Sequence, residues 1–183
     1  LSSSLKIISY GTERMDQPTL NKLCVQFPNI DFRQTYGMSE LGILRIKSES
    51  RDSLFMQVGG EGIEVKIDNK ILFIRSKNKM IGYLNAASPF DESGWYNTKD
   101  IVETKSNKFL KIIGRDGELI NVGGLKFMPY EIEKECLKIK GIKHAKALGK
   151  DNPITGQHVE LEIELDKNLD FSITKTDILK ELK

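Results

Sequence analysis

The sequence has little cysteine and no long apolar run. Cys24 and Cys136 are its two cysteines, and they lie far apart without a Cys-x-x-Cys spacing. This pattern indicates reduced thiols rather than a disulfide framework. The chain also has only two histidines, so the dispersed donors do not predict a transition-metal centre. No apolar stretch approaches the ~20 residues that a membrane-spanning helix needs.

An excess of charge of one sign is also missing. The 183 residues carry 28 basic and 26 acidic side chains, a net charge of +2, which excludes a general attraction to nucleic acid. Residues 1–11 lack the basic segment and apolar stretch of a signal peptide, so we expect a cytoplasmic protein. They also lack an initiator Met, which suggests a chain cut from a longer one. The ordinary composition indicates one or two globular domains.

The most informative stretch is 114–133, GRDGELINVGGLKFMPYEIE. It opens on Gly114-Arg115 and has a second glycine pair at Gly123-Gly124, where the backbone can adopt angles that other residues resist. Pro129 followed by glutamates is typical of a helix N-terminus. The pattern suggests a ligand-facing joint, although a plain surface hairpin has the same features.

The N-terminal segments alternate between strand and helix signals. An apolar strand is predicted at 5–10, and it runs into Gly11-Thr12-Glu13, where open α/β sheets place ligands. An ordinary strand-to-helix turn explains this stretch equally well. Asp16 or Thr19 is predicted to cap the helix that follows. A second strand is predicted at 30–35.

That second strand leads into Tyr36-Gly37-Met38-Ser39-Glu40. A hydroxyl and a carboxylate after a glycine turn could serve a phosphate and its Mg²⁺, because Mg²⁺ is usually held by one or two carboxylates and phosphate oxygens. The alternative is that Ser39 caps a helix.

From Leu44 onward the pattern changes to short strands separated by turn signals. The turns fall at Gly59-Gly60 and Asp68-Asn69, and the spacing predicts a small antiparallel sheet or barrel. The predicted strands are 55–58, 63–67 and 71–75.

A turn-rich segment, SPFDESGWYNTKD at 88–100, comes next. Asp100 is predicted to end this loop just before a strand, where its carboxylate could accept both hydroxyls of a ribose. A turn-capping side chain is the alternative. A hairpin of 101–103 and 109–113 then leads to Gly114.

Beyond the joint, the pattern predicts strands and two helices. In 158–165 apolar residues alternate with glutamates, as in a half-buried strand, and His158 falls on the solvated face. The other predicted strands are 118–122 and 145–148. The predicted helices are 129–140, with Ile132, Cys136, Leu137 and Ile139 inward, and a stretch from Ser172 or Thr174 to Lys183, with Ile178, Leu179 and Leu182 as its apolar side.

Taken in order, the segments resemble the adenylate-forming enzymes, which include acyl-CoA synthetases, aryl-CoA ligases, nonribosomal peptide adenylation domains and luciferases. The resemblance covers nearly the whole chain, and Met38-Ser39 is closer to the acyl- and aryl-CoA ligase branch. It rests on GTE (11–13), TYGMSE (35–40), GWYNTKD (94–100) and GRDGELINVGGLKFMPYEIE (114–133), with weaker similarity in ILFIRS (71–76), IGYLN (81–85) and KDNPITGQHVELEIEL (150–165).

The resemblance implies a mixed α+β fold in two parts. Residues 1–113 would be the C-terminal part of the large AMP-binding domain, with a β-rich subdomain at 43–113. Residues 114–183 would be an incomplete, mobile α+β lid. The implied activity joins a fatty or aryl acid to ATP as an acyl-adenylate and passes the acyl group to CoA.

The resemblance also implies roles for individual residues. Gly11, Thr12 and Glu13 would line the adenine pocket and Tyr36 would flank the adenine, with Thr35, Gly37 and Met38 among the cofactor-binding residues. Asp100 would grip both ribose hydroxyls, and Arg115 would add a ribose contact. Ser39 would contact the α-phosphate and Glu40 would hold Mg²⁺, while Lys126 would lie near phosphate or CoA. Gly124 would lie near the pantetheine tunnel in the thioester-forming state.

Three departures from the family pattern affect the activity that we expect of this chain. Gly117 occupies the hinge position, where the family usually has Asp or Lys. The phosphate loop would precede Leu1, and the catalytic lysine would follow Lys183, so we expect little activity from this chain alone. We also expect self-association of the fragment. A scaffold relative without catalysis, or an enzyme that loads a carrier-protein thiol, is the alternative.

Overall fold

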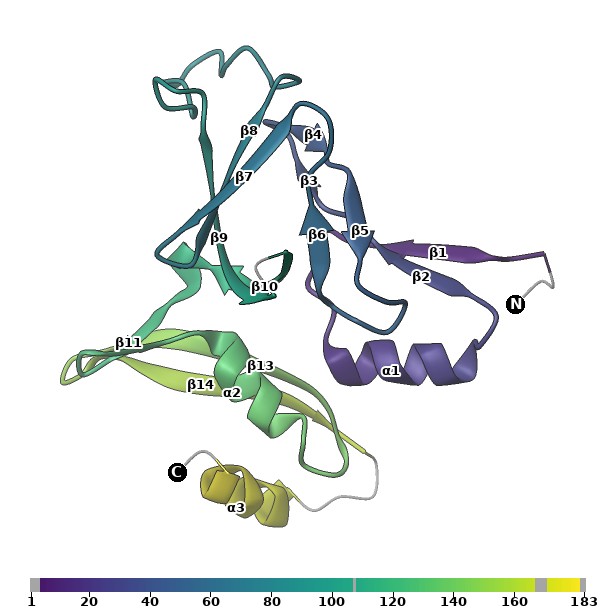
Figure 1. Cartoon of the computed structure of the whole chain (residues 1–183). Helices are drawn as coiled ribbons and strands as arrows, with labels where there is room; N and C mark the ends of the chain where they lie inside the picture. The colour runs from purple at the N-terminus through teal and green to yellow at the C-terminus, as the bar shows by residue number, and fades with distance from the viewer. Residues whose placement is uncertain (1–3, 107, 167–170, 182–183) are drawn as a thin grey trace. The chain divides into compact units, whose positions relative to one another are not determined.

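The computed structural model describes residues 4–106, 108–166 and 171–181. The chain divides into two compact units, Leu1–Ile112 and Ile113–Lys183. The fold is mixed α+β and contains a curled antiparallel sheet (Figure 1), so the predicted fold class is confirmed. None of the helices in the described residues is both long and apolar enough to cross a membrane.

The first unit begins with two parallel strands joined by a helix. Strands β1 (Ile7–Tyr10) and β2 (Asp31–Gln34) pair in register, and α1 (Gln17–Gln26) connects them. Asp16 caps α1, because its side chain accepts a hydrogen bond from the Thr19 amide at 2.7 Å. Leu20 on α1 is fully buried. The predicted strands, helix and Asp16 cap are therefore confirmed.

A six-stranded antiparallel sheet forms most of the rest of this unit, in the order β5-β6-β10-β9-β8-β7. Strand β8 alternates buried and half-buried residues, and its Leu72 and Ile74 lie in the core with Met56 and Val102. The strands are β5 (Ile46–Ser48), β6 (Met56–Val58), β7 (Ile63–Asp68), β8 (Ile71–Ser76), β9 (Tyr96–Lys105) and β10 (Phe109–Arg115).

Two details of this unit differ from the sequence prediction. Ser39 does not cap a helix, because it lies in the turn of a small hairpin between β3 (Gly37–Met38) and β4 (Gly42–Ile43). Asp100 does not precede a strand but lies inside β9, which starts at Tyr96. The strand begins early because Tyr96 and Asn97 already pair with Ile74 and Phe73 of β8.

In the second unit a four-stranded sheet, ordered β12-β11-β14-β13, packs against helices α2 and α3. Its core contains Cys136, Ile142, Ala145 and Ile178. The elements are the 3₁₀ turn η1 (Asp116–Glu118), β11 (Ile120–Val122), β12 (Leu125–Phe127), α2 (Pro129–Cys136), β13 (Ile142–Asn152), β14 (Gly156–Leu165) and α3 (Phe171–Glu181).

The second unit corrects several predicted boundaries and one predicted side chain. Strand β11 begins at Ile120 instead of 118, because Asp116–Glu118 form the 3₁₀ turn η1. Helix α2 ends at Cys136 instead of 140, because the following residues form tighter i→i+3 turns. Strand β13 is longer than the predicted 145–148, and α3 begins at Phe171. Leu179, predicted to be inward, is 54% exposed, and Leu182 lies outside the described residues.

Candidate functional site

The loops after β1 and β2 lie against each other at the carboxyl ends of the two parallel strands. The Thr35 amide and hydroxyl both donate to the Tyr10 carbonyl, at 2.7 and 3.1 Å. A Cβ atom on Gly11 would lie 2.1 Å from the Thr35 hydroxyl oxygen, so only glycine fits there without a shift. The GTE and TYGMSE segments are thus in direct contact, at the edge where open α/β sheets bind ligands.

Thr12 adds backbone strain to the first of these loops. Its φ is +71°, and the Glu13 amide donates to the Gly11 carbonyl at 2.8 Å. A γ-turn with positive φ at its central residue is rare and strained. Strain of this kind clusters at ligand-binding sites, which supports a functional interpretation of Gly11-Thr12-Glu13 over an ordinary turn.

Asp100 is the buried carboxylate of this region, with 6% exposure. The Tyr36 hydroxyl donates to its Oδ2 atom at 2.5 Å, across 64 positions of sequence. The Asp100 amide donates to the Thr98 hydroxyl at 3.0 Å, and that hydroxyl donates to the Leu72 carbonyl at 2.8 Å. These contacts fix the carboxylate, which can accept further hydrogen bonds through its remaining lone pairs.

An irregularity in the β8–β9 pairing sets the direction of the Asp100 side chain. The register shifts between the Ile71–Ile101 and Phe73–Asn97 pairs, and Lys99 inside this bulge has a φ of +59°. Bulges of this kind redirect side chains and are common beside active sites. The bulge therefore explains how a residue within a strand reaches Tyr36.

Glu40 lies half-buried at the β3–β4 turn, beside the exposed Ser39. The Met80 amide donates to its backbone carbonyl at 2.9 Å, and the Tyr83 hydroxyl donates to its carboxylate. Among the described residues no group of three or more acidic, His or Cys side chains forms a metal site. A hydroxyl beside one carboxylate fits a hard cation such as Mg²⁺ when nucleotide phosphates supply the other oxygens.

The remaining predicted residues belong to the second unit. Arg115 is exposed, and its amide donates to Glu118 Oε2 at 3.0 Å. Gly123 and Gly124 have φ of +59° and +92° and form the tight turn between β11 and β12. Lys126 on β12 is exposed and pairs with Asn121. The 114–133 stretch thus contains a hairpin, the plain alternative that its sequence also allowed.

Sequence reasoning assigned no role to Thr98 or Tyr83, although both contact predicted residues. Thr98 stands two positions before Asp100, a spacing at which a threonine hydroxyl often accepts from the backbone. Tyr83 falls in the weakly similar IGYLN segment. Its partner Glu40 is 43 positions away, a pairing for which the sequence holds no local signal.

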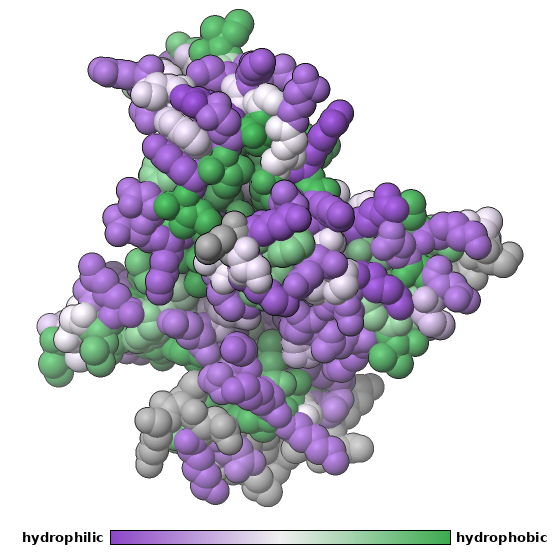
Figure 2. Space-filling view, in the orientation of Figure 1, coloured by the Kyte–Doolittle hydropathy of each residue, from purple (hydrophilic) through white to green (hydrophobic). Residues whose placement is uncertain are grey.

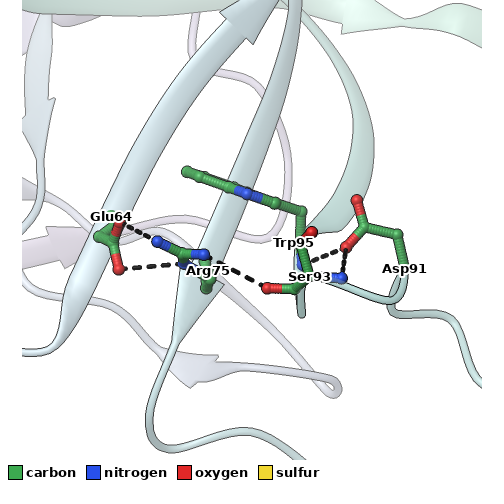
Figure 3. A network of polar contacts seen from close by, with 5 residues as sticks. All are labelled: Glu64, Arg75, Asp91, Ser93 and Trp95. Atoms are coloured by element: carbon green, nitrogen blue, oxygen red, sulfur yellow. Dashed lines mark hydrogen bonds and ion pairs between the residues drawn. The ribbon is translucent and has the colours of Figure 1, made fainter.

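A separate polar cluster lies on the β7–β8 hairpin (Figure 3). Arg75 pairs with Glu64 and donates to the Ser93 carbonyl at 3.3 Å. The Lys66 ammonium and the Arg75 guanidinium lie 4.4 and 4.9 Å from the centroid of the Trp95 ring. Asp91 accepts the amides of Ser93 and Trp95 and closes the 91–95 turn. These contacts give Ser93 and Trp95 a structural role in this turn.

Comparison with known proteins relates the chain to a group of ligases. No family model matches it. It is 30% identical over 162 residues to the uncharacterized acyl–CoA ligase YhfT of Bacillus subtilis, covering 80% of this chain and 33% of YhfT. It is 23% identical to the medium/long-chain-fatty-acid–[acyl-carrier-protein] ligase FadD10 of Mycobacterium tuberculosis, covering 94% of this chain and 36% of FadD10.

A solved structure agrees with these relatives. Escherichia coli MenE, with a bound analogue of OSB-AMS, superposes with a TM-score of 0.72 at 26% identity, covering 96% of this chain and 40% of MenE. The chain spans about a third of the length of YhfT and FadD10.

Proposed function

Because this chain belongs to the adenylate-forming superfamily, we propose that it is part of an ATP-dependent acid–thiol ligase. The enzyme makes an acyl-adenylate from a fatty or aryl acid and transfers the acyl group to CoA. The observation that carries this proposal is the hydrogen bond between Tyr36 and the buried Asp100, which brings two separate motifs to one point.

In this proposal the first unit binds the nucleotide. Asp100 accepts the two ribose hydroxyls, and Tyr36 flanks the adenine while it fixes the Asp100 carboxylate. The adenine pocket is completed by Gly11, Thr12, Glu13, Thr35, Gly37 and Met38. The contact between Gly11 and Thr35 supports this grouping, as does the strained Thr12.

The proposed chemistry has two steps. A carboxylate oxygen of the acid attacks the α-phosphorus of ATP, and the bond to the pyrophosphate leaving group breaks. The CoA thiolate then attacks the acyl carbon, and AMP leaves. Both steps depend on positioning and charge neutralisation, so exposed donors such as Ser39 at the α-phosphate suit the task.

Mg²⁺ bound at Glu40 would neutralise the charge that develops on the phosphates. The carboxylate of Glu40 is the group that would hold it, while the neighbouring Ser39 hydroxyl would contact the α-phosphate. Because one carboxylate binds Mg²⁺ weakly without phosphate, we expect the nucleotide and the cation to bind together.

The two units would have separate tasks. We assign residues 1–113 to the large AMP-binding domain and residues 114–183 to a mobile lid that turns near Gly117. Arg115 would bring a ribose contact, Lys126 a positive charge near phosphate or CoA, and Gly124 a surface for pantetheine. A cytoplasmic location is part of the proposal, since both cysteines are free thiols.

A carrier-protein thiol is the second candidate acceptor. FadD10, which matches 94% of this chain, is a ligase for an acyl carrier protein by its name. Acceptor assays with the complete protein, offered CoA or a phosphopantetheinylated carrier protein, would separate the two. A thioester formed on only one acceptor decides the question.

The binding test uses AMP and isothermal titration calorimetry on the 183-residue chain. We expect Asp100→Asn to weaken AMP binding about 10–100-fold, because a charge-assisted hydrogen bond contributes about 1.5–3 kcal/mol. Asp151→Asn, an exposed aspartate of the second unit, is the matched control. The absence of AMP binding by the unsubstituted chain, or equal weakening by both substitutions, would contradict the proposal.

We also propose that this chain alone does not complete adenylation, since it spans about a third of its relatives' length. Incubation with ATP, Mg²⁺ and a panel of carboxylic acids should release no pyrophosphate above background. The complete protein should show acid-dependent pyrophosphate exchange. Turnover by the chain itself would rule this part out.

A further inference from the structure

The segment between β8 and β9 is tied to Glu40 at two points. The Met80 amide donates to the Glu40 backbone carbonyl at 2.9 Å, and the Tyr83 hydroxyl donates to Glu40 Oε1. Glu40 comes from the β3–β4 turn, so the two contacts join parts of the first unit that are some 40 residues apart. One contact fixes the backbone of Glu40 and the other fixes its side chain.

Residues 81–87 have little else to hold them. All seven are exposed, and the side chains of Ile81 and Leu84 are fully open to solvent. Within the described part of the chain, the Tyr83–Glu40 bond is the hydrogen bond that connects residues 81–87 to anything else. The Tyr83 hydroxyl is therefore the point at which the Glu40 carboxylate contacts this segment.

The hydrogen bond from Tyr83 to Glu40 can orient the Glu40 carboxylate as a metal ligand. A phenol that donates to a carboxylate forms a charge-assisted hydrogen bond, which is stronger than a neutral one. Hydrogen bonds of this kind hold a carboxylate in the direction in which it binds a cation, and their loss typically costs 10–100-fold in metal affinity.

We propose that Tyr83 is a positioning residue for Glu40, and that its segment couples to divalent-cation binding at that carboxylate. The inference rests on the proposed function. By occupying Oε1, the Tyr83 hydroxyl directs the rest of the carboxylate toward the cation. Because coupling is reciprocal, a cation bound at Glu40 holds residues 81–87 more firmly in turn.

The first test separates metal binding from nucleotide binding. Mn²⁺ affinity is measured by electron paramagnetic resonance with saturating ATP, and AMP affinity is measured in EDTA. Tyr83→Phe should weaken Mn²⁺ binding about 10-fold and leave AMP binding unchanged. Tyr36→Phe is the matched control, because it also removes a hydroxyl from a carboxylate, and it should weaken AMP binding in EDTA.

The second test follows the segment itself. Chymotrypsin cleaves after aromatic residues, so Tyr83→Phe keeps the cleavage site while it removes the hydroxyl. We expect cleavage after residue 83 to become several-fold faster in Tyr83→Phe. In the unsubstituted chain, Mn²⁺ with ATP should slow this cleavage, and in Tyr83→Phe the protection should be lost.

The outcomes distinguish the inference from the function on which it rests. No AMP binding by the unsubstituted chain overturns both. Normal AMP binding with equal Mn²⁺ affinities in the unsubstituted chain and Tyr83→Phe overturns the inference alone. Equal loss of Mn²⁺ and AMP affinity in Tyr83→Phe also overturns it, because a general disturbance of the fold would then explain the effect.

Discussion

Tyr36 and Asp100 form a pair whose energy can be measured apart from any ligand. Asp100 is buried, and its bond to the Tyr36 hydroxyl is charge-assisted. We predict that Tyr36→Phe lowers the free energy of unfolding of the first unit by about 1.5–3 kcal/mol at pH 7. Urea unfolding followed by the fluorescence of Trp95 measures this, because Trp95 is the sole tryptophan and lies in this unit.

Tyr10→Phe is the control for that measurement. Within the described residues the Tyr10 hydroxyl has no hydrogen-bond partner, so its removal should change the free energy of unfolding by less than about 0.5 kcal/mol. If the two substitutions have equal effects, the Tyr36–Asp100 bond does not contribute as described.

Gly117 and Gly124 stand close in sequence but differ in what they require of the backbone. Gly124 has a φ of +92°, whereas Gly117 lies outside the left-handed region, and a Cβ on it would meet no atom. We predict that Gly117→Ala stabilises the second unit by about 0.4–1 kcal/mol, while Gly124→Ala destabilises it by about 1–2 kcal/mol. Hydrogen exchange of the β13 and β14 amides reports both changes.

This pair also bears on the proposed hinge. If the fold requires glycine at position 117, Gly117→Ala will destabilise the second unit. That result would contradict the open space around Gly117. If the fold tolerates alanine, any loss of thioester formation in the complete Gly117→Ala protein must come from domain movement. The two measurements together separate a structural glycine from a hinge glycine.

Sequence patterns proposed candidate site residues but did not describe their surroundings. Asp100 was proposed from the motif, but its position inside β9 depends on pairing with β8 and on the bulge at Lys99. The hydroxyl partners Thr98 and Tyr83 gave no signal, because side-chain contacts between distant segments leave no periodic pattern. Local turn chemistry was easier, as the Asp16 cap and the Gly123-Gly124 turn demonstrate.

At the scale of elements, the reactivity of the two cysteine thiols tests how well two helices are packed. Cys136 on α2 is fully buried, and burial raises the pKa of its thiol. Cys24 on α1 is only half-buried. Because the thiolate is the reactive form, we predict that Cys24 reacts with Ellman's reagent in the native chain, and that Cys136 reacts at least about 100-fold more slowly.

Substitution assigns the two reaction phases. Cys24→Ser should remove the fast phase, and Cys136→Ala should remove the slow one. In 6 M guanidinium, a general denaturing condition, both thiols should react at similar rates. Rapid labelling of Cys136 in the native chain would show that α2 does not cover its sheet as described.

Most of the errors in the predicted elements concern where strands begin and end. The alternation in 158–165 predicted β14 with a start only two residues too late, because one face of this strand is apolar and the other is charged. Its partner β13 buries small residues, Ala145 and Ala147, among lysines, so only part of it could be recognised. Its length is set by pairing with β14 from Ile142 to Asn152, which is a tertiary property.

At the scale of the whole molecule, the order of strands was the least predictable feature. Strand β6 pairs with β10, more than 50 positions away, at Leu110 and Met56. No turn signal specifies such a pairing, and only the resemblance to a known family implied a fold that contains it. The two units, Leu1–Ile112 and Ile113–Lys183, each have a core of their own, which permits independent unfolding.

Exposed apolar side chains motivate the last prediction, which concerns self-association of the chain. Hydrophilic residues cover much of the visible surface, with apolar patches between them (Figure 2). In the first unit Ile43, Ile81 and Leu84 are 88%, 104% and 101% exposed. We predict reversible dimers or larger species at high concentration, since exposed apolar surface favours association.

Sedimentation velocity over a range of concentrations measures this association. The triple substitution of Ile43, Ile81 and Leu84 by Ser should return the chain to a monomer, because it removes apolar area that a second copy could bury. The control replaces Leu125 and Ile154 by Ser, two exposed residues of the second unit, and should leave association unchanged. A monomer at every concentration, or an equal effect of both sets, would contradict association through the first unit.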